Sequence, residues 1–218
     1  MPMTKISASI LNADLAHLSD VAATAKTAGA DFIHYDVMDG IFVDNLSFGL
    51  PVLQCLKKYA ELPIDAHLMI QEPHRFVSRF AEAGAEMLSF HIESSSDTID
   101  TIRLIHENGM KAGIAVSPDT PVSDVFPYLS MLQDDDFVLL MTVHPGYGKQ
   151  KFLNYVLDKI KELRAEMNAK QLNLHIQVDG GIQAETAKLC REAGADNLVS
   201  GSYLFCSESP AEAVRSLR

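Results

Sequence analysis

Short runs of apolar, β-favouring residues alternate with longer amphipathic stretches along the whole chain. The short runs predict strands, and the stretches between them predict helices. The predicted strands are Ile6–Ile10, Phe32–Met38, Ile64–Ile70, Met87–His91, Lys111–Val116, Phe137–Val143, Leu174–Val178 and Leu198–Val199. The predicted helices are Asp14–Ala28, Pro51–Tyr59, Pro73–Ala83, Asp97–Asn108, a shorter one near Val122, Phe152–Ala169, Ala184–Glu192 and a final helix from Pro210. This alternation indicates an α/β fold with a parallel sheet.

A four-residue sequence, Ala-Gly-Ala followed by an acidic residue, occurs three times and indicates how many units the sheet contains; we call this repeat the echo. The sequences Ala28–Asp31, Ala83–Glu86 and Ala193–Asp196 each end a predicted helix, and their glycines stand 55 and then 110 residues apart. A chain of 218 residues divided into eight units gives about 27 residues per unit, so the echoes fall two and four units apart. We therefore expect a single (β/α)8 barrel domain over residues 1–218, because no linker interrupts the alternation.

The second predicted strand carries unusual polar residues. Residues two apart in a strand share a face, so His34, Asp36 and Met38 project the same way. Buried charge is costly unless it is paired or bound to a cation, so this face is a candidate for metal ligands. A buried His–Asp pair with only a structural role is an equally good explanation of this stretch alone.

Two further residues extend the candidate metal site. His67 lies in the next strand at the same apparent depth as Asp36, and together with His34 they form a mixed nitrogen and oxygen site suited to zinc, iron, manganese or cobalt. Asp179 ends the seventh strand, nearly opposite Asp36 across the barrel. Two carboxylates facing each other over one ligand are suited to removing a proton from one side of a carbon and returning it on the other. Taken alone, His67 could be a core histidine and Asp179 part of a tight turn.

Glycine-rich turns follow three consecutive strands. Glycine lets backbone N–H groups approach an anion closely, and the last loops of this fold are its customary phosphate region. We expect these turns to bind a phosphate: Gly146, Tyr147 and Gly148 with Lys149 or Lys151, then Gly180 and Gly181, then Gly201 and Ser202. Three methionines end strands and are either core filler or a water-excluding lining for a planar intermediate: Met38, Met69 and Met141.

Composition narrows the class of partner. The formal net charge of −11 argues against general affinity for nucleic acid or anionic membranes. No segment approaches the roughly 20 apolar residues that span a bilayer. The three cysteines, Cys55, Cys190 and Cys206, are far apart and not in metal-type spacing. We expect a cytoplasmic protein that binds a small molecule, assembles as a homo-oligomer and contacts neither nucleic acid nor membrane.

The sequence resembles the ribulose-phosphate 3-epimerase family over essentially its whole length. The motifs that carry the resemblance are Ile6–Leu11, His34–Gly40, Asp65–Met69 with Pro73, Pro145–Gly148 with Gln150–Phe152, Val178–Ile182 and Gly201–Ser202. The resemblance implies a TIM barrel of the ribulose-phosphate-binding type and an isomerase that epimerises a ketose phosphate at C3, most simply D-ribulose 5-phosphate to D-xylulose 5-phosphate.

The resemblance also implies a role for each site residue. One divalent metal would be held by His34, Asp36, His67 and Asp179, and the two aspartates would be the acid and base that form and quench an enediolate. Substrate contacts would come from Ser9, His67, Gly146, Tyr147, Gly148, Lys149, Gly180, Gly181, Gly201 and Ser202, and the methionines would line the enediolate.

Several positions depart from the family's usual pattern. Ala8, His144, Lys149 and Gln177 stand where the family usually has proline, asparagine, glycine and glutamate, and Ile41 and Asp44 replace a histidine and a proline. These changes cluster near the substrate loops, so D-allulose 6-phosphate competes with the five-carbon substrate. Two other possibilities are a keto-sugar-phosphate decarboxylase, whose third-strand lysine is missing here, and a catalytically silent phosphate-binding barrel.

Overall fold

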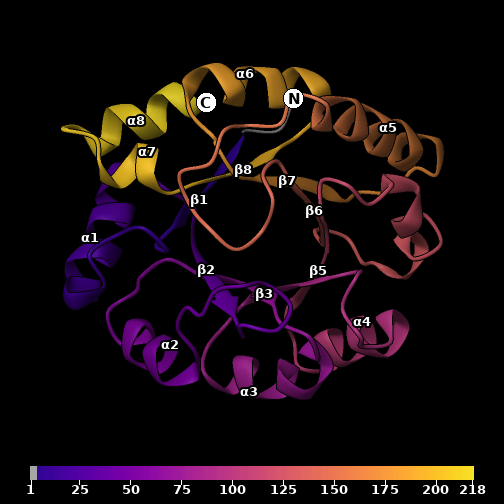
Figure 1. The fold of residues 1–218 in the computed structure, drawn as a ribbon, viewed down its shortest axis with the longest axis horizontal. Coiled ribbons are helices and arrows are strands. Elements are labelled where there is room, and N and C mark those ends of the chain that lie inside the picture. Colours follow the sequence, from indigo (N-terminus) through magenta and orange to yellow (C-terminus); the bar gives the residue numbers. More distant parts are fainter. Residues whose placement is uncertain (1–3) are drawn as a thin grey trace.

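The computed structural model describes residues 4–218, and within that range eight parallel strands close into one barrel (Figure 1). Each strand pairs with its neighbours in sequence, and β1 closes the barrel against β8. The strands are β1 (Lys5–Ser9), β2 (Phe32–Met38), β3 (Ile64–Met69), β4 (Met87–His91), β5 (Lys111–Val116), β6 (Phe137–Met141), β7 (His175–Asp179) and β8 (Asn197–Ser200). The predicted (β/α)8 architecture is confirmed.

Helices surround the barrel and connect successive strands (Figure 1). The α-helices are α1 (Leu18–Ala28), α2 (Leu50–Lys57), α3 (Val77–Glu82), α4 (Thr98–Glu107), α5 (Val156–Ala169), α6 (Ala184–Ala193), α7 (Ser202–Phe205) and α8 (Pro210–Leu217). Short 3-10 turns occupy Leu15–His17, Pro73–Phe76, Val122–Val125 and Leu129–Met131. Within residues 4–218, none of the helices combines the length and the apolar character that crossing a bilayer requires.

Two boundaries near the carboxyl ends of the strands differ from the sequence prediction. Helix α5 begins at Val156 rather than Phe152, and the backbone N–H of Leu153 instead donates to the carbonyl of Thr142, 2.9 Å away, just after β6. The short helix α7 begins at Ser202, where the pattern predicted only a turn. Both segments follow the carboxyl ends of strands, so their backbone lies at that end of the barrel.

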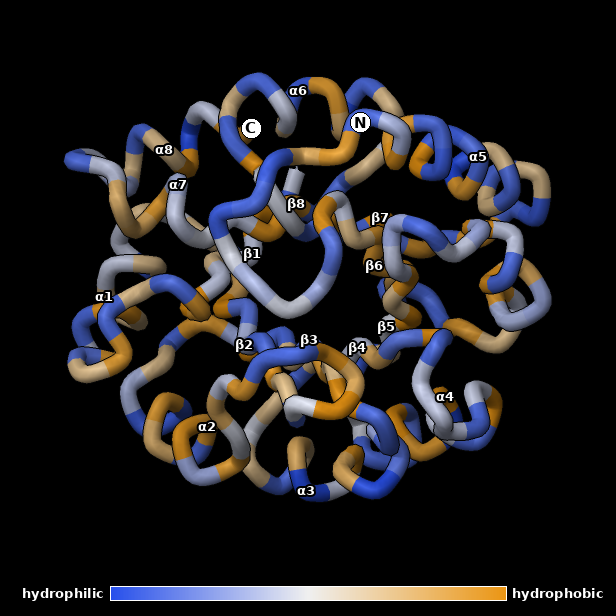
Figure 2. Tube along the Cα trace, viewed as in Figure 1, coloured by the Kyte–Doolittle hydropathy of each residue, from blue (hydrophilic) through white to orange (hydrophobic). Residues whose placement is uncertain are grey.

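The two faces of each strand have different roles. Outward-facing residues such as Ile33, Tyr35 and Leu68 pack against the helices in the main hydrophobic core. In Figure 2 the helices alternate between hydrophobic and hydrophilic residues, as expected when one face of a helix packs on the barrel. The barrel interior instead holds an apolar cluster around Phe137 and Leu139 and a set of fully buried polar side chains.

Four acidic residues fasten the amino ends of the strands. Each stands directly before an even-numbered strand and accepts a hydrogen bond from the backbone N–H at the start of the preceding odd-numbered strand. The pairs are Asp31 with Ile6 at 2.8 Å, Glu86 with Ile64 at 2.7 Å, Asp136 with Ala112 at 2.9 Å and Asp196 with Ile176 at 2.9 Å. Three of these acids end the sequence echo, so the echo marks a structural clamp that recurs in every second unit.

The clamp at Asp136 provides a test of its contribution to stability. Asp136 is fully buried and also accepts hydrogen bonds from the Gln133 backbone N–H and from His106 Nε2, each at 2.7 Å. The substitution Asp136→Asn would turn an amide toward these donors and should lower the free energy of unfolding by about 2–3 kcal/mol in urea titrations. The exposed neighbour Asp134 serves as the control. An equal loss of unfolding free energy in Asp134→Asn would contradict a stabilising role for Asp136.

Candidate metal centre and phosphate pocket

Strands β2 and β3 bring two histidines and one aspartate to the same point of the barrel interior. The strand register pairs Asp36 with His67 and His34 with Asp65, and all four side chains are buried. The distances to Asp36 Oδ1 are 3.3 Å from His34 Nε2 and 3.3 Å from His67 Nδ1. Asp179 approaches from β7, with Oδ2 at 3.7 Å from His34 Nε2 and 4.0 Å from His67 Nδ1.

The four ligand atoms fit a divalent cation. They all lie within 4.8 Å of one another. Metal bonds of about 2.0–2.2 Å in tetrahedral geometry would separate ligand atoms by about 3.3–3.6 Å, close to the distances found here. His34 Nε2 is buried and has no hydrogen-bond partner, which is unfavourable unless another group occupies the cluster. Two imidazoles and two carboxylates can therefore hold a metal ion here.

Asp65 orients His34, a role that the sequence analysis did not assign. Asp65 Oδ2 lies 2.8 Å from His34 Nδ1 and accepts a hydrogen bond of 2.6 Å from Gln177 Nε2. A hydrogen on His34 Nδ1 leaves the Nε2 lone pair facing the cluster, as metal-bound histidines require. The position of Asp65, two residues before His67 and so on the same face of β3, was the available signal.

The pKa values of the two histidines determine which of them holds a proton when the metal is absent. Burial opposes the charged form of His34, but the neighbouring Asp36 and Asp65 carboxylates raise the pKa of His34 well above its ordinary value. A proton and a cation therefore compete for the same buried nitrogen. Burial acts in the same direction on His67, and here it dominates, lowering the pKa of His67 to about 4.

The two aspartates differ in their preferred protonation state. Burial alone would raise the pKa of Asp36, but the charge of His34 and the close approach of both imidazoles hold it well below the usual range. Burial, reinforced by repulsion from Asp36, raises the pKa of Asp179 to about 7 in the absence of a metal ion. One carboxylate and one carboxylic acid can thus coexist at neutral pH.

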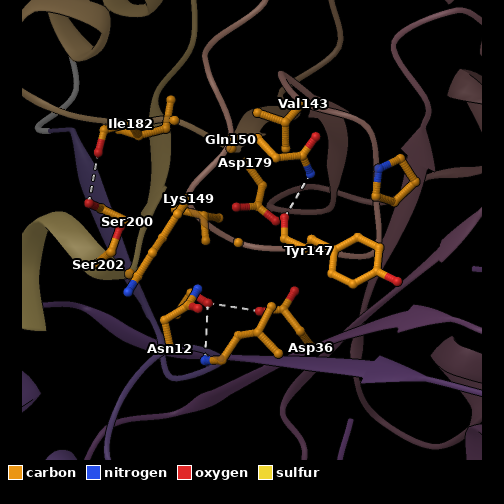
Figure 3. Close-up of a pocket in the computed structure, with 18 of the residues that line it drawn as sticks. Asn12, Asp36, Val143, Tyr147, Lys149, Gln150, Asp179, Ile182, Ser200 and Ser202 are labelled. Atoms are coloured by element: carbon orange, nitrogen blue, oxygen red, sulfur yellow. Dashed lines mark hydrogen bonds between the residues drawn. The ribbon is translucent and has the colours of Figure 1, made fainter. Parts of the chain in front are cut away.

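A cavity of about 600 Å³ opens above the cluster at the carboxyl ends of the strands. Asp36 and Asp179 enter it from different sides, and Lys149 extends along it (Figure 3). The structure brings most of the predicted contact residues into its wall: Ser9, Met38, Met69, Met141, Gly146, Tyr147, Gly148, Lys149, Lys151, Gly180, Gly181, Gly201 and Ser202. His34 and His67 do not line the cavity but lie fully buried beneath it.

Glycine is required where the cavity wall is tightest. A Cβ on Gly148 would lie 1.8 Å from Asn12 Nδ2, and a Cβ on Gly180, whose φ is +118°, would lie 2.3 Å from Val143. Lys149 adopts a φ of 60°, which suits the glycine usual at this position better than a lysine. The backbone at Gly148 and Gly180 therefore packs directly against neighbouring side chains, which only glycine allows.

Several lining residues were not predicted from the sequence. Asn12 and Gln183 reach the wall from loops, and Tyr203 comes from helix α7. Gln150 shapes the loop after β6, because its Nε2 donates to the carbonyls of His144 and Tyr147 at 2.7 Å each. Loops lack the periodicity that marks an inward-facing position, so no pattern distinguished these residues.

Comparison with known proteins gives a consistent result. The model of the "Ribulose-phosphate 3 epimerase family" matches residues 5–205. The ribulose-phosphate 3-epimerase of Bacillus subtilis is 44% identical over 217 residues, with 99% of each chain covered. That of Escherichia coli K12 is 43% identical, covering 92% of this chain and 88% of the relative.

Solved structures with much lower identity share the fold. A crystal structure of KGPDC from Streptococcus mutans superimposes with a TM-score of 0.72 at 14% identity, covering 99% of this chain and 95% of that one. The 3-hexulose-6-phosphate synthase of Salmonella typhimurium gives 0.72 at 17% identity, covering 98% and 96%. These likenesses concern the barrel alone.

The raised pKa of Asp179 predicts a pH dependence for the metal-free protein. Below pH 3.8 the group is protonated in both folded and unfolded chains, and between pH 3.8 and about 7 only the unfolded chain loses the proton. The Asp179 contribution to stability is therefore lost as the pH rises through this window. After the metal has been removed with a chelator, urea titrations should show that the free energy of unfolding of the wild type falls across this pH window relative to that of Asp179→Asn, whose amide does not titrate. A stability difference that is constant from pH 4 to 8 would contradict it.

Proposed function

We propose that this chain, which belongs to the ribulose-phosphate 3-epimerase family, inverts C3 of a ketose phosphate, interconverting D-ribulose 5-phosphate and D-xylulose 5-phosphate. The observation that carries the proposal is the pair Asp36 and Asp179. Their carboxylates come from β2 and β7, line one cavity, and favour opposite protonation states.

Inversion needs one aspartate ionised and the other protonated, and the metal-free cluster favours ionised Asp36 and protonated Asp179. Ionised Asp36 removes the C3 proton from one face of the sugar, which leaves an enediolate. Protonated Asp179 donates its proton to C3 from the other face, which produces the inverted configuration. The two residues exchange roles in the reverse reaction. Ser9 Oγ donates to Asp36 Oδ2 at 2.8 Å and fixes the orientation of this carboxylate.

The metal ligands in this proposal are His34, Asp36, His67 and Asp179. A divalent ion of zinc, iron, manganese or cobalt held there would act as a Lewis acid toward the sugar's carbonyl and hydroxyl oxygens. Asp65 holds His34 in the tautomer that can serve as a ligand. The protein thereby prepares the cluster before the substrate arrives.

The remaining cavity residues position and shield the sugar. Backbone N–H groups near Gly148, Gly180 and Gly201 bind the phosphate, and the Lys149 ammonium supplies positive charge beside them. Binding of this remote group helps to orient the reacting carbon. Met38, Met69 and Met141 are nearly fully buried and cover the reacting end with polarizable, apolar surface.

The substrate's chain length depends on residues that depart from the family pattern. His144 and Lys149 both line the cavity, so they are in position to contact the part of the sugar near the phosphate. D-allulose 6-phosphate is accordingly the second candidate. Cytoplasmic location and homo-oligomeric assembly belong to the same proposal, and a relative 40% identical to this chain is named as the cytoplasmic isoform of Oryza sativa.

Single asparagine substitutions test the two-base reaction. Asp36→Asn and Asp179→Asn should each lower kcat by about 10²–10⁴-fold, because one of the two proton transfers is lost. Each variant should still exchange the C3 hydrogen of one epimer with deuterated solvent, and the two variants should act on opposite epimers. Asp158→Asn on helix α5, whose side chain is 85% exposed, is the matched control.

The same experiment compares the two sugars. The wild-type kcat/KM should be higher for D-ribulose 5-phosphate than for D-allulose 6-phosphate. Near-normal turnover in either aspartate variant, with metal content measured alongside, would refute the two-base scheme. A preference for the six-carbon sugar would replace the substrate but leave the chemistry unchanged.

Metal removal gives an independent prediction. Dialysis against a chelator should abolish epimerase activity and lower the melting temperature, because the ion stabilises only the folded chain. Adding back zinc, iron, manganese or cobalt should restore both, and the most effective ion at equal occupancy identifies the best match. Full activity in protein shown to be metal-free by elemental analysis would exclude a metal requirement.

A further inference from the structure

A chain of hydrogen-bonding groups continues from the metal cluster to the outside of the barrel. His67 Nε2 lies 3.0 Å from His91 Nε2, and His91 Nδ1 lies 3.0 Å from Glu93 Oε2. Both imidazoles are fully buried, and their rings stack with centroids 5.1 Å apart. The proposed reaction assigns no role to His91 or Glu93.

The outer end of this chain favours one direction for its hydrogen bonds, in competition with Asp36 Oδ1 at the inner end, which lies 3.3 Å from His67 Nδ1 and also only accepts. The carboxylate of Glu93 only accepts, so His91 Nδ1 carries the hydrogen and donates it. A neutral His91 then presents a lone pair on Nε2, and His67 must donate from its own Nε2. When a cation takes the place of a proton between His67 Nδ1 and Asp36, the hydrogen of His67 is thus held on Nε2 and the lone pair on Nδ1 faces the cation.

We infer that Glu93 is a positioning residue that acts through His91 to fix the tautomer of His67, so that His67 Nδ1 is free to bind the cation. This inference rests on the metal site of the proposed function but not on the identity of the sugar. It gives His67 the same kind of support that Asp65 gives His34 directly. Both imidazole ligands then owe their orientation to a carboxylate that does not bind the metal.

The surroundings of Glu93 make glutamine a sharper probe than alanine. Glu93 Oε1 accepts a hydrogen bond of 2.8 Å from the Ser117 backbone N–H. In Glu93→Gln the amide oxygen must stay on that side, which turns the NH2 group toward His91 Nδ1. His91 then accepts on Nδ1 and carries its hydrogen on Nε2, so His67 must accept on Nε2 and hold its hydrogen on Nδ1. The metal-binding nitrogen becomes blocked.

Alanine leaves the direction of the chain unchanged. In Glu93→Ala, His91 Nδ1 can still donate to Ser117 Oγ, which lies 3.4 Å away in the present structure. His67 then keeps its hydrogen on Nε2, with weaker support. If Glu93 served only to fill space, the alanine variant would bind the metal more weakly than the glutamine variant, since glutamine preserves the shape of glutamate and alanine does not.

The experiment measures metal affinity and tautomers rather than turnover. The full chain is stripped of metal, and cobalt and zinc affinities are determined by chelator competition for wild type, Glu93→Gln, Glu93→Ala and Glu72→Gln. Glu72 is the matched control, because its side chain is 54% exposed and pairs with Arg75 instead of an imidazole. We expect Glu93→Gln to bind about 10–100-fold more weakly than wild type, Glu93→Ala to lie in between, and Glu72→Gln to be unchanged.

Histidine 15N NMR of the stripped proteins provides the readout that a purely structural role would not move. The fraction of His67 protonated on Nε2 should be larger in wild type than in Glu93→Gln, with circular dichroism confirming that both are folded. Equal affinity of wild type and Glu93→Gln, or weaker binding by alanine than by glutamine, would overturn the inference while the proposed metal site stands. A wild-type chain that binds neither metal would refute the metal site and this inference together.

Discussion

The compensation of buried charge governs the interior of this barrel. Asp36 and Asp65 are almost completely shielded from water, and carboxylates in such a place are tolerated only when hydrogen bonds and opposite charge surround them. His34 supplies positive charge beside both carboxylates and donates a hydrogen bond to Asp65, and His67 contributes as a neutral neighbour of Asp36 at 3.3 Å. Strand register produces the arrangement, because it sets Asp36 beside His67 and His34 beside Asp65. The same crowding affects Asp179, because burial and repulsion from Asp36 raise its pKa.

The two ends of the barrel carry different physical tasks. At the amino ends, carboxylates such as Asp31 and Asp136 accept backbone hydrogen bonds and fasten strands to each other. At the carboxyl ends, Asp36 and Asp179 face an open cavity instead. The same residue type therefore fastens strands at one end and, in the proposed reaction, transfers protons at the other. Loops after the strands can vary in sequence without disturbing the fastening below them.

Much of this organisation was predictable because strands and helices have strict periods. Alternation along β2 placed His34 and Asp36 on one face, and the glycine echo gave the number of units. The fourth clamp, Asp136, escaped the echo because it follows a run of aspartates rather than an Ala-Gly-Ala sequence. The role of Asp65 depends on a contact across strands, and Asn12 reaches the cavity from a loop. Such contacts depend on three-dimensional packing, which a single sequence does not encode as a repeating pattern.

The clamps also divide the barrel into pairs of strands. Each acid accepts a backbone hydrogen bond between two successive strands, as Glu86 does for β3 and β4, and Asp31 also bonds Arg218, which ties the first pair to the end of the chain. Four such pairs in succession complete the ring, so the amino end of the barrel is tied at regular intervals around its circumference.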